Sequence, residues 1–486
     1  MRWHRPAPAA RRASVAAALA LLVAAPASAG ATSAFTNFEP STTPGVTCPG
    51  STRCTNTAAE PAIRADRAGR FFAASENGLG GGTLAWRSAD GGRHYTALPS
   101  PNGAGDPLTP AGGDVDVAVA PDINAGDHYY NVYVASLNLA SIYVSTSSNG
   151  GRSWTVQNPV ASFEKGANDR EWIAADEASK VCISYHDAPQ GIPVDCSYNA
   201  GRLFAQHSNA IDAAHAYQTA NNSIGNLAID QSEGSTDHTV YQIYSAITSP
   251  AEVACAPPVG TCGYHGVYMG VSTDGGRSFT DHAIYVSPDA TVSYGSQFPN
   301  VSVDNAGNVY AVFSDGHDVF FSYSTTRGRS WSAPVRLNAA GTTAIMPWSS
   351  ALGAGKIDVV WYGSTHREAG PVDSYPATAT WKVEFAQNLH ATTAGSAFTT
   401  TAATPVVHMG GVCLSGIACT GNRDLYDDFG VAASPTTGLA SIVYSDDQFH
   451  GTAASPPAPG CTAGTTNTSS CDHTALATQV SGTGIK

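Results

Sequence analysis

The stretch Ser272-Thr273-Asp274-Gly275-Gly276-Arg277-Ser278-Phe279-Thr280 is typical of a tight turn between two β-strands. Asp274 can accept hydrogen bonds from the backbone N–H groups that follow it, as in an Asx-turn. Gly275 and Gly276 supply backbone angles that other residues reach only with strain. Phe279 then begins a strand and offers a large apolar face to bury. The stretch therefore predicts a strand–turn–strand unit.

The same pattern recurs along the chain. Four further copies, of which the last lacks the acidic or amide residue, lie at residues 88–95, 147–154, 197–204 and 324–331, and a degraded sixth lies at 392–398. An internal repeat of this length indicates stacked or radial units, each too small to bury its own apolar face. Between the turns, short runs rich in Val, Ile, Tyr and Phe are punctuated by Gly, Asp, Asn and Pro, which predicts an all-β fold.

Seven strand–turn–strand units can be counted, and they include Ile63, Val115, Trp172, Leu227, Val301, Ser349 and Phe429. We expect a β-propeller of seven four-stranded antiparallel blades, with six blades as the alternative if one unit is an insertion. The seventh unit ends near Val480 without an outer strand, which residues 34–38 could supply. Pairing of the two termini would then close the ring and remove the exposed sheet edges.

The repeated turns resemble the Asp-box, or bacterial neuraminidase repeat, of sialidase-like β-propellers. The resemblance extends over nearly all of the chain that follows the first residues. Sialidases of this type have six blades and act at the central funnel, whereas Asp-box turns lie at the opposite face. The resemblance therefore implies structural roles for the turn residues Asp90, Asn149, Asn199 and Asp274.

The N-terminus has the pattern of an export signal. Arginines precede an apolar run at residues 13–25, and Ala27-Ser28-Ala29 matches a cleavage site. We expect residues 1–29 to be a signal peptide, residues 30–486 to form a single propeller domain, and the mature protein to be secreted.

The 10 cysteines fall into pairs that are close in sequence. This predicts disulfides in an oxidising compartment, and the absence of a Cys-x-x-Cys pair disfavours a zinc–thiolate site. The expected pairs are Cys48/Cys54, Cys182/Cys196, Cys255/Cys262, Cys413/Cys419 and Cys461/Cys471.

The formal net charge of −14 argues against nucleic acid as a partner, because nucleic-acid binding needs a basic face. No apolar run after the signal is long enough to span a membrane. We expect a monomer that binds a glycan or glycoconjugate.

Acids and histidines gather at the expected starts of the inner strands and at the ends of the second strands. The inner-strand starts carry Glu60, Asp114, Asp116, residues 168–171 and residues 423–428, and the second-strand ends carry Glu76, Asp187, Asp315 and Asp446. Three interpretations remain open: a solvated rim with internal ion pairs, a glycosidase site with paired carboxylates, or a divalent cation site.

The sialidase resemblance implies specific roles on this rim. A tyrosine nucleophile helped by a glutamate would correspond to Tyr426 and Glu171, with Asp169 as an alternative acid/base. Arg170 and Arg423 would bind the substrate anion, beside Asp427 and Asp428. The family's Arg-Ile-Pro motif matches at Pro61, but its arginine position holds Ala59.

Two functions follow as hypotheses. The first is a carbohydrate-active protein, a sialidase-like exo-glycosidase acting at the funnel. The second is a non-catalytic binding or scaffold propeller at the cell surface. We expect no required cofactor. A structural Ca²⁺ ion is compatible with the clustered acids, because carboxylate oxygens are its usual ligands.

Overall fold

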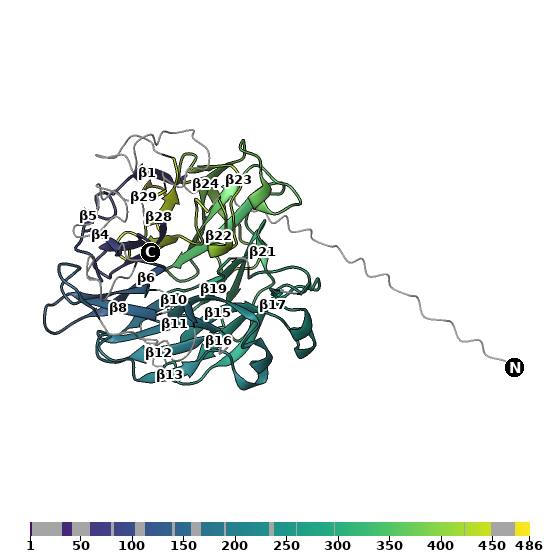
Figure 1. Cartoon of the computed structure of the whole chain (residues 1–486), viewed down its shortest axis with the longest axis horizontal. Helices are drawn as coiled ribbons and strands as arrows, with labels where there is room; N and C mark the ends of the chain where they lie inside the picture. The colour runs from purple at the N-terminus through teal and green to yellow at the C-terminus, as the bar shows by residue number, and fades with distance from the viewer. Residues whose placement is uncertain are drawn as a thin grey trace.

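The computed structural model describes residues 1, 32–40, 59–78, 82–102, 112–138, 141–156, 167–188, 191–232, 238–258, 260–295, 297–421, 423–448 and 472–486. The strands of these residues form seven small antiparallel sheets arranged in a ring (Figure 1). The prediction of a seven-bladed propeller is confirmed, and the six-bladed alternative is wrong. The helices of the described residues are short 3-10 turns.

The first four blades each contain four strands. They are β2 (Ala59–Ala65), β3 (Phe71–Glu76), β4 (Leu84–Ser88) and β5 (Thr96–Ala97); β6 (Val115–Ile123), β7 (Tyr130–Asn138), β8 (Ser141–Ser147) and β9 (Thr155–Val156); β10 (Ala167–Asp176), β11 (Lys180–Ala188), β12 (Pro193–Ser197) and β13 (Gln206–Asn209); and β14 (Asn222–Ile229), β15 (Val240–Ala246), β16 (Gly266–Ser272) and β17 (Thr280–Val286).

The last three blades follow in the same order, and the sixth carries one additional short strand. They are β18 (Asn300–Val303), β19 (Val309–Ser314), β20 (Val319–Ser324) and β21 (Val335–Arg336); β22 (Thr343–Ala351), β23 (Ile357–Ser364), β24 (Thr380–Asn388), β25 (Thr399–Ala402) and β26 (His408–Met409); and β27 (Gly430–Ala433), β28 (Ala440–Asp446), β29 (His473–Ser481) and β1 (Ala34–Phe38).

The ring closes as the sequence predicts, because β1 pairs antiparallel with β29 as the outer strand of the seventh blade. Side chains strengthen this closure. The Tyr444 hydroxyl donates to Asn37 Oδ1 at 3.0 Å, and Asn37 Nδ2 donates to the Ala403 carbonyl at 3.0 Å. The rings of Phe35 and Phe385 pack edge to face at 5.0 Å. The closing strand therefore contacts both the sixth and seventh blades.

The hydrophobic core consists of apolar layers between neighbouring blades. One layer packs β6, β7 and β8 against β10 and β11, and another packs β15 and β16 against β18 and β19. Successive inner strands contact each other around the ring, from β2 to β27 and back to β2. Each blade therefore buries its two faces against its neighbours, as expected for units that cannot fold alone.

The repeated turns join the third and fourth strands of the first five blades. In the quoted repeat, Asp274 Oδ1 accepts hydrogen bonds from the N–H groups of Arg277 and Ser278 at 2.9 and 3.0 Å. The Gly276 N–H donates to Ser272 Oγ at 2.8 Å, and Gly276 has a φ of 92°. The Cβ of any other residue at Gly276 would lie 3.1 Å from Cys196 Sγ in the third blade. The turn thus fixes both the hairpin and its contact with the neighbouring blade.

Three of the five expected disulfides are confirmed. Cys182–Cys196 links β11 to β12, and Cys255–Cys262 and Cys413–Cys419 close short loops. The cysteines of the other two pairs lie outside the described residues, as does the expected signal peptide apart from Met1. Among the described residues, no helix has the length and apolar character needed to cross a membrane.

The turn predicts a graded effect of substitution at Asp274. Asp274→Ala removes the acceptor of two backbone N–H groups and should lower the free energy of unfolding by about 1–2 kcal/mol, as loss of a helix N-cap does. Asp274→Asn should cost less, because Asn149 keeps one of the two equivalent contacts in the second blade, where its Oδ1 accepts from the Ser153 N–H at 3.0 Å. Urea unfolding of both variants measures the difference, and equal losses would contradict this account of the turn.

Candidate functional site

The seven site residues predicted from the sequence lie at one mouth of the ring. Asp169, Arg170 and Glu171 belong to β10, whereas Arg423, Tyr426, Asp427 and Asp428 directly precede β27. We call this region, together with Glu60, Glu76 and Asp114, the funnel mouth. Ion pairs between its members join the first, second, third and seventh blades.

Arg170 is the buried centre of the funnel mouth, with a side chain that is 5% exposed. Its Nη1 lies 3.6 Å from Glu60 Oε2 and 3.6 Å from Asp114 Oδ2. Its Nη2 donates a hydrogen bond to Asp428 Oδ2. Three acids from three other blades therefore share one guanidinium, which satisfies the requirement that a buried charge be paired.

Two adjoining aromatic rings contact the same guanidinium. The Arg170 Cζ atom lies 4.1 Å from the centroid of the Trp172 ring and 4.9 Å from that of the Phe298 ring. Contact with ring faces stabilises a cation, more so where water is excluded. Trp172 is completely buried, in agreement with the packing role that its apolar surroundings require. Arg170 is thus fixed in place by neighbouring acids and rings of the protein.

Arg423 forms a second, more accessible cationic centre. Its Nη2 lies 3.0 Å from Glu60 Oε1 and 2.7 Å from Asp427 Oδ2, and its side chain is 28% exposed. Its Cζ atom lies 5.1 Å from the centroid of the Tyr426 ring. Glu60 consequently bridges the two arginines, Arg170 through one carboxylate oxygen and Arg423 through the other.

Glu60 and Arg170 occupy bulges in their strands. Both have left-handed backbone angles, with φ of 46° and 45°, and the pairing register shifts at each of them. Met346 in β22 is equivalent, with φ of 52° next to a register shift. Such a conformation costs on the order of 1–3 kcal/mol for a residue other than glycine and is typical of functional sites. A bulge interrupts the two-residue alternation and reorients the side chain.

Three acids of the funnel mouth converge, and two of them, Glu60 and Asp114, also pair with Arg170. Glu60, Glu76 and Asp114 each offer a carboxylate oxygen, and these oxygens lie within 4.8 Å of one another. Burial and the proximity of Asp114 raise the pKa of Glu76 to about 8. Burial, Glu76 and Asp114 likewise raise the pKa of Glu60 well above its usual range. At neutral pH, Glu76 is therefore a proton donor next to another carboxylate.

The remaining predicted residues differ in environment. Asp169 is exposed, and its Oδ1 accepts a hydrogen bond from the Arg170 N–H at 3.0 Å. Glu171 is completely buried, neither of its carboxylate oxygens has a hydrogen-bond partner among the described residues, and burial and Asp114 raise its pKa. Burial and nearby acids, Asp472 first, raise the pKa of the Tyr426 hydroxyl above its usual value.

A cavity of about 480 Å³ lies further along the axis of the ring. The ends of the inner strands line it, and Arg67 and Lys486 lie on its wall. The C-terminus accordingly lies near the centre of the ring (Figure 1). None of the funnel-mouth residues lines this cavity. Arg64 lies on its wall and pairs with Asp116 Oδ1 at 3.2 Å, which places an ion pair between the two regions.

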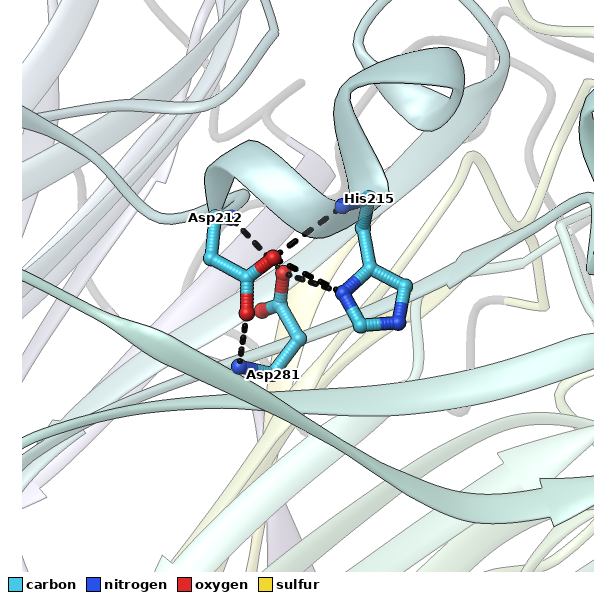
Figure 2. A group of neighbouring side chains, drawn as sticks. All are labelled: Asp212, His215 and Asp281. Carbon is cyan, nitrogen blue, oxygen red and sulfur yellow. Dashed lines mark hydrogen bonds and ion pairs between the residues drawn. The ribbon is translucent and has the colours of Figure 1, made fainter.

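Asp212, His215 and Asp281 lie close together and resemble a metal-binding group (Figure 2). Their polar atoms, however, form hydrogen bonds with one another. Asp212 caps the 3-10 helix η2 (Ala213–Gln218). The Asp281 N–H donates to Asp212 Oδ2 at 2.9 Å, and the Asp212 N–H donates to Asp281 Oδ2 at 2.8 Å. His215 Nδ1 lies 2.9 Å from Asp212 Oδ1. These reciprocal bonds attach η2 to β17.

Sequence reasoning placed Glu60, Glu76 and Asp114 on the rim but did not include them among the site residues. The sequence feature that could have identified them as site residues was their position at strand ends in a chain with only 13% charged residues. What identifies them is their contact with one another and with Arg170, which joins residues far apart in the sequence.

No family model and no curated protein matches the chain. Among solved structures, a protein of unknown function from Dyadobacter fermentans shows 13% identity and a TM-score of 0.44, covering 92% of this chain and 98% of its own. An α-L-arabinanase from Penicillium chrysogenum, complexed with arabinobiose, shows 11% identity and a TM-score of 0.45 over 92% and 98%. The GH74 xyloglucanase from Xanthomonas campestris shows 16% identity and a TM-score of 0.46 over 84% and 52%. These likenesses assign no activity to this chain.

Replacing Arg170 should destabilise the whole ring. Arg170→Met leaves Glu60, Asp114 and Asp428 without their shared cation, and breaking a buried ion pair in this way costs about 3–5 kcal/mol. Arg152→Met is the matched control, because Arg152 also lies over an aromatic ring, that of Tyr129 at 4.9 Å, but is exposed. Urea unfolding near pH 7 measures both, and equal losses in the two variants would show that Arg170 is not the centre of the site.

Proposed function

We propose that this protein is a secreted carbohydrate-active propeller that hydrolyses a glycosidic bond at the funnel mouth. The observation that carries the proposal is the pair formed by Glu76 and Asp114, whose carboxylate oxygens lie within 4.8 Å of one another. Glycosidases use two carboxyl groups on either side of the scissile bond, and those about 5–5.5 Å apart retain the anomeric configuration. The short separation therefore favours a retaining mechanism.

The two carboxyl groups suit different roles. Glu76, whose pKa burial and Asp114 raise to about 8, holds a proton at neutral pH and can donate it to the leaving-group oxygen. Asp114 lies 3.6 Å from the Arg170 guanidinium, which holds it in position to attack the anomeric carbon as the nucleophile. Arg170 acts here as a positioning residue, because its donors face the acids of the protein.

The sequence-based assignment remains an alternative within the same site. It places the nucleophile at Tyr426, the acid/base at Asp169 or Glu171, and substrate contacts at Arg423, Asp427 and Asp428. Burial and the surrounding acids raise the pKa of Tyr426, which disfavours the phenolate that a tyrosine nucleophile provides. We therefore favour the carboxyl pair and keep Tyr426 as the competing candidate.

A neutral sugar fits this site better than a sialoside. A sialic acid carboxylate needs free arginine donors. Arg170 is paired with three acids, and Arg423 with Glu60 and Asp427. The net charge of −14 also disfavours an anionic ligand.

A non-catalytic glycan-binding or scaffold propeller is the second candidate. The specific observation in its favour is that both arginines of the funnel mouth are engaged in ion pairs within the protein. In that case the raised pKa of Glu76 would reflect only the burial of a structural acid.

Substitution of Glu76 tests the proposal. With aryl glycosides of neutral sugars, Glu76→Gln should lower kcat/KM by about 10²–10⁴-fold, the usual contribution of a general acid. The wild-type kcat/KM should fall as the pH rises through about 8, because Glu76 then loses its proton. Glu177→Gln, an exposed glutamate in the turn after β10, should leave both the rate and the pH profile unchanged.

Three outcomes separate the candidates. A rate lost in Tyr426→Phe but kept in Glu76→Gln would support the sequence-based assignment instead. Release of sialic acid from a fluorogenic sialoside would contradict the preference for neutral sugars. Glycan binding without hydrolysis of any substrate would support the non-catalytic candidate.

A further inference from the structure

A second group of ionisable residues is buried between the sixth and seventh blades, outside the funnel mouth. His408 in β26, Asp424 and Asp447 offer ligand atoms within 4.8 Å of one another, and all three are 0–2% exposed. His408 Nδ1 lies 2.8 Å from Asp447 Oδ2, and His408 Nε2 lies 3.1 Å from the Gly411 carbonyl. Because Nε2–H donates to a carbonyl and Nδ1 faces a carboxylate, both ring nitrogens are occupied.

Asp472 extends this group across a pair of strands. Asp446, the last residue of β28, pairs with His473, the first residue of β29, and Asp447 and Asp472 directly adjoin this pair. Asp424 and Asp447 are also the two charged groups that act most strongly on Asp472.

Asp424 and Asp472 differ from Asp447, whose two carboxylate oxygens contact His408 Nδ1 and the Gln448 side-chain amide. Asp424 Oδ2 and both carboxylate oxygens of Asp472 are buried and lack a hydrogen bond of standard geometry from a described residue. The contacts nearest to one are those of His408 Nδ1, 4.0 Å from Asp424 Oδ2, and of the Tyr426 hydroxyl, which lowers the pKa of Asp472 against the larger effect of burial. Asp424 and Asp472 are only 2% exposed. An unpaired buried carboxylate is among the costliest groups a protein can contain. These buried oxygens must therefore either carry a proton or contact a ligand.

The lack of a cation in this group favours a divalent ion. Three carboxyl groups and one histidine ring are buried here, and among the ion pairs of the described residues no lysine or arginine contacts them. A divalent cation would supply the positive charge that these buried oxygens lack.

We propose that Asp424, Asp447 and Asp472 together bind one Ca²⁺ ion, which attaches the segment before β27 to the ends of β28 and β29. Carboxylate oxygens are the ligands that Ca²⁺ prefers. His408 orients Asp447 and does not touch the ion, because both of its nitrogens are engaged. The same segment contains Tyr426 and Arg423, so the ion would fix one wall of the funnel mouth. The proposal does not depend on whether the protein hydrolyses glycans.

Calcium-dependent thermal stability tests the site. The protein is stripped with chelator, and its Tm and its binding stoichiometry by titration calorimetry are measured with CaCl₂. We expect one Ca²⁺ per chain and a rise in Tm of about 3 °C at a free calcium concentration of about 100 times Kd, for a chain of this size. Asp424→Asn with Asp472→Asn should abolish both effects.

Control variants locate the ion. Asp281→Asn alters the other acid–histidine group (Figure 2), and Glu76→Gln alters the acids of the funnel mouth; both should keep the calcium effect. If the double variant does not fold, Asp472→Asn alone is measured instead and should likewise abolish the calcium effect. Loss of the effect in Glu76→Gln only, its persistence in the double variant, or no calcium binding by the wild type would overturn the proposal. A larger Tm rise with Zn²⁺ than with Ca²⁺ would contradict an oxygen-only site.

Discussion

The guanidinium of Arg170 is the interaction on which the funnel mouth depends. It is buried against the adjoining rings of Trp172 and Phe298 and pairs with Glu60, Asp114 and Asp428, which come from three other blades. Burial of so many acids is unfavourable unless a cation offsets their charge. Burial and the nearby Asp114 raise the pKa of Glu76, and no arginine contacts Glu76 directly among the described ion pairs. Arg170 therefore sets the positions of the acids, whereas burial and Asp114 set the protonation of Glu76.

The scaffold that holds this cation is built from local units closed into a ring. The turns of the first five blades fix each hairpin, and β1 closes the last blade against β29. Closure matters for the site because Arg170 lies in the third blade and Asp428 directly precedes the seventh. The strained backbone at Glu60 and Arg170 is maintained only because the neighbouring blades pack on both sides.

Much of the fold was predictable from the sequence, because it is encoded locally. Turn chemistry at residues such as Asp274 and Gly276 marks each blade, and the missing outer strand identified residues 34–38 as the closing strand. The convergence of Arg170 with Asp428 was also foreseeable, since strand starts meet at one mouth of a propeller. The role of Glu60 could not be foreseen, because a bulge has no clear sequence signal. The group around His408 depends on contacts between β26, β28 and β29 that no local pattern records.

The central claim is that the funnel mouth holds a protonated carboxyl group at neutral pH. Infrared difference spectra of the wild type and Glu76→Gln, recorded across a pH titration, test it most directly. The account predicts a protonated carboxyl band that is absent in the variant and disappears in the wild type with a midpoint near pH 8. A band that disappears near the ordinary glutamate pKa of about 4.3 would contradict the account, because Glu76 would then be ionised at neutral pH.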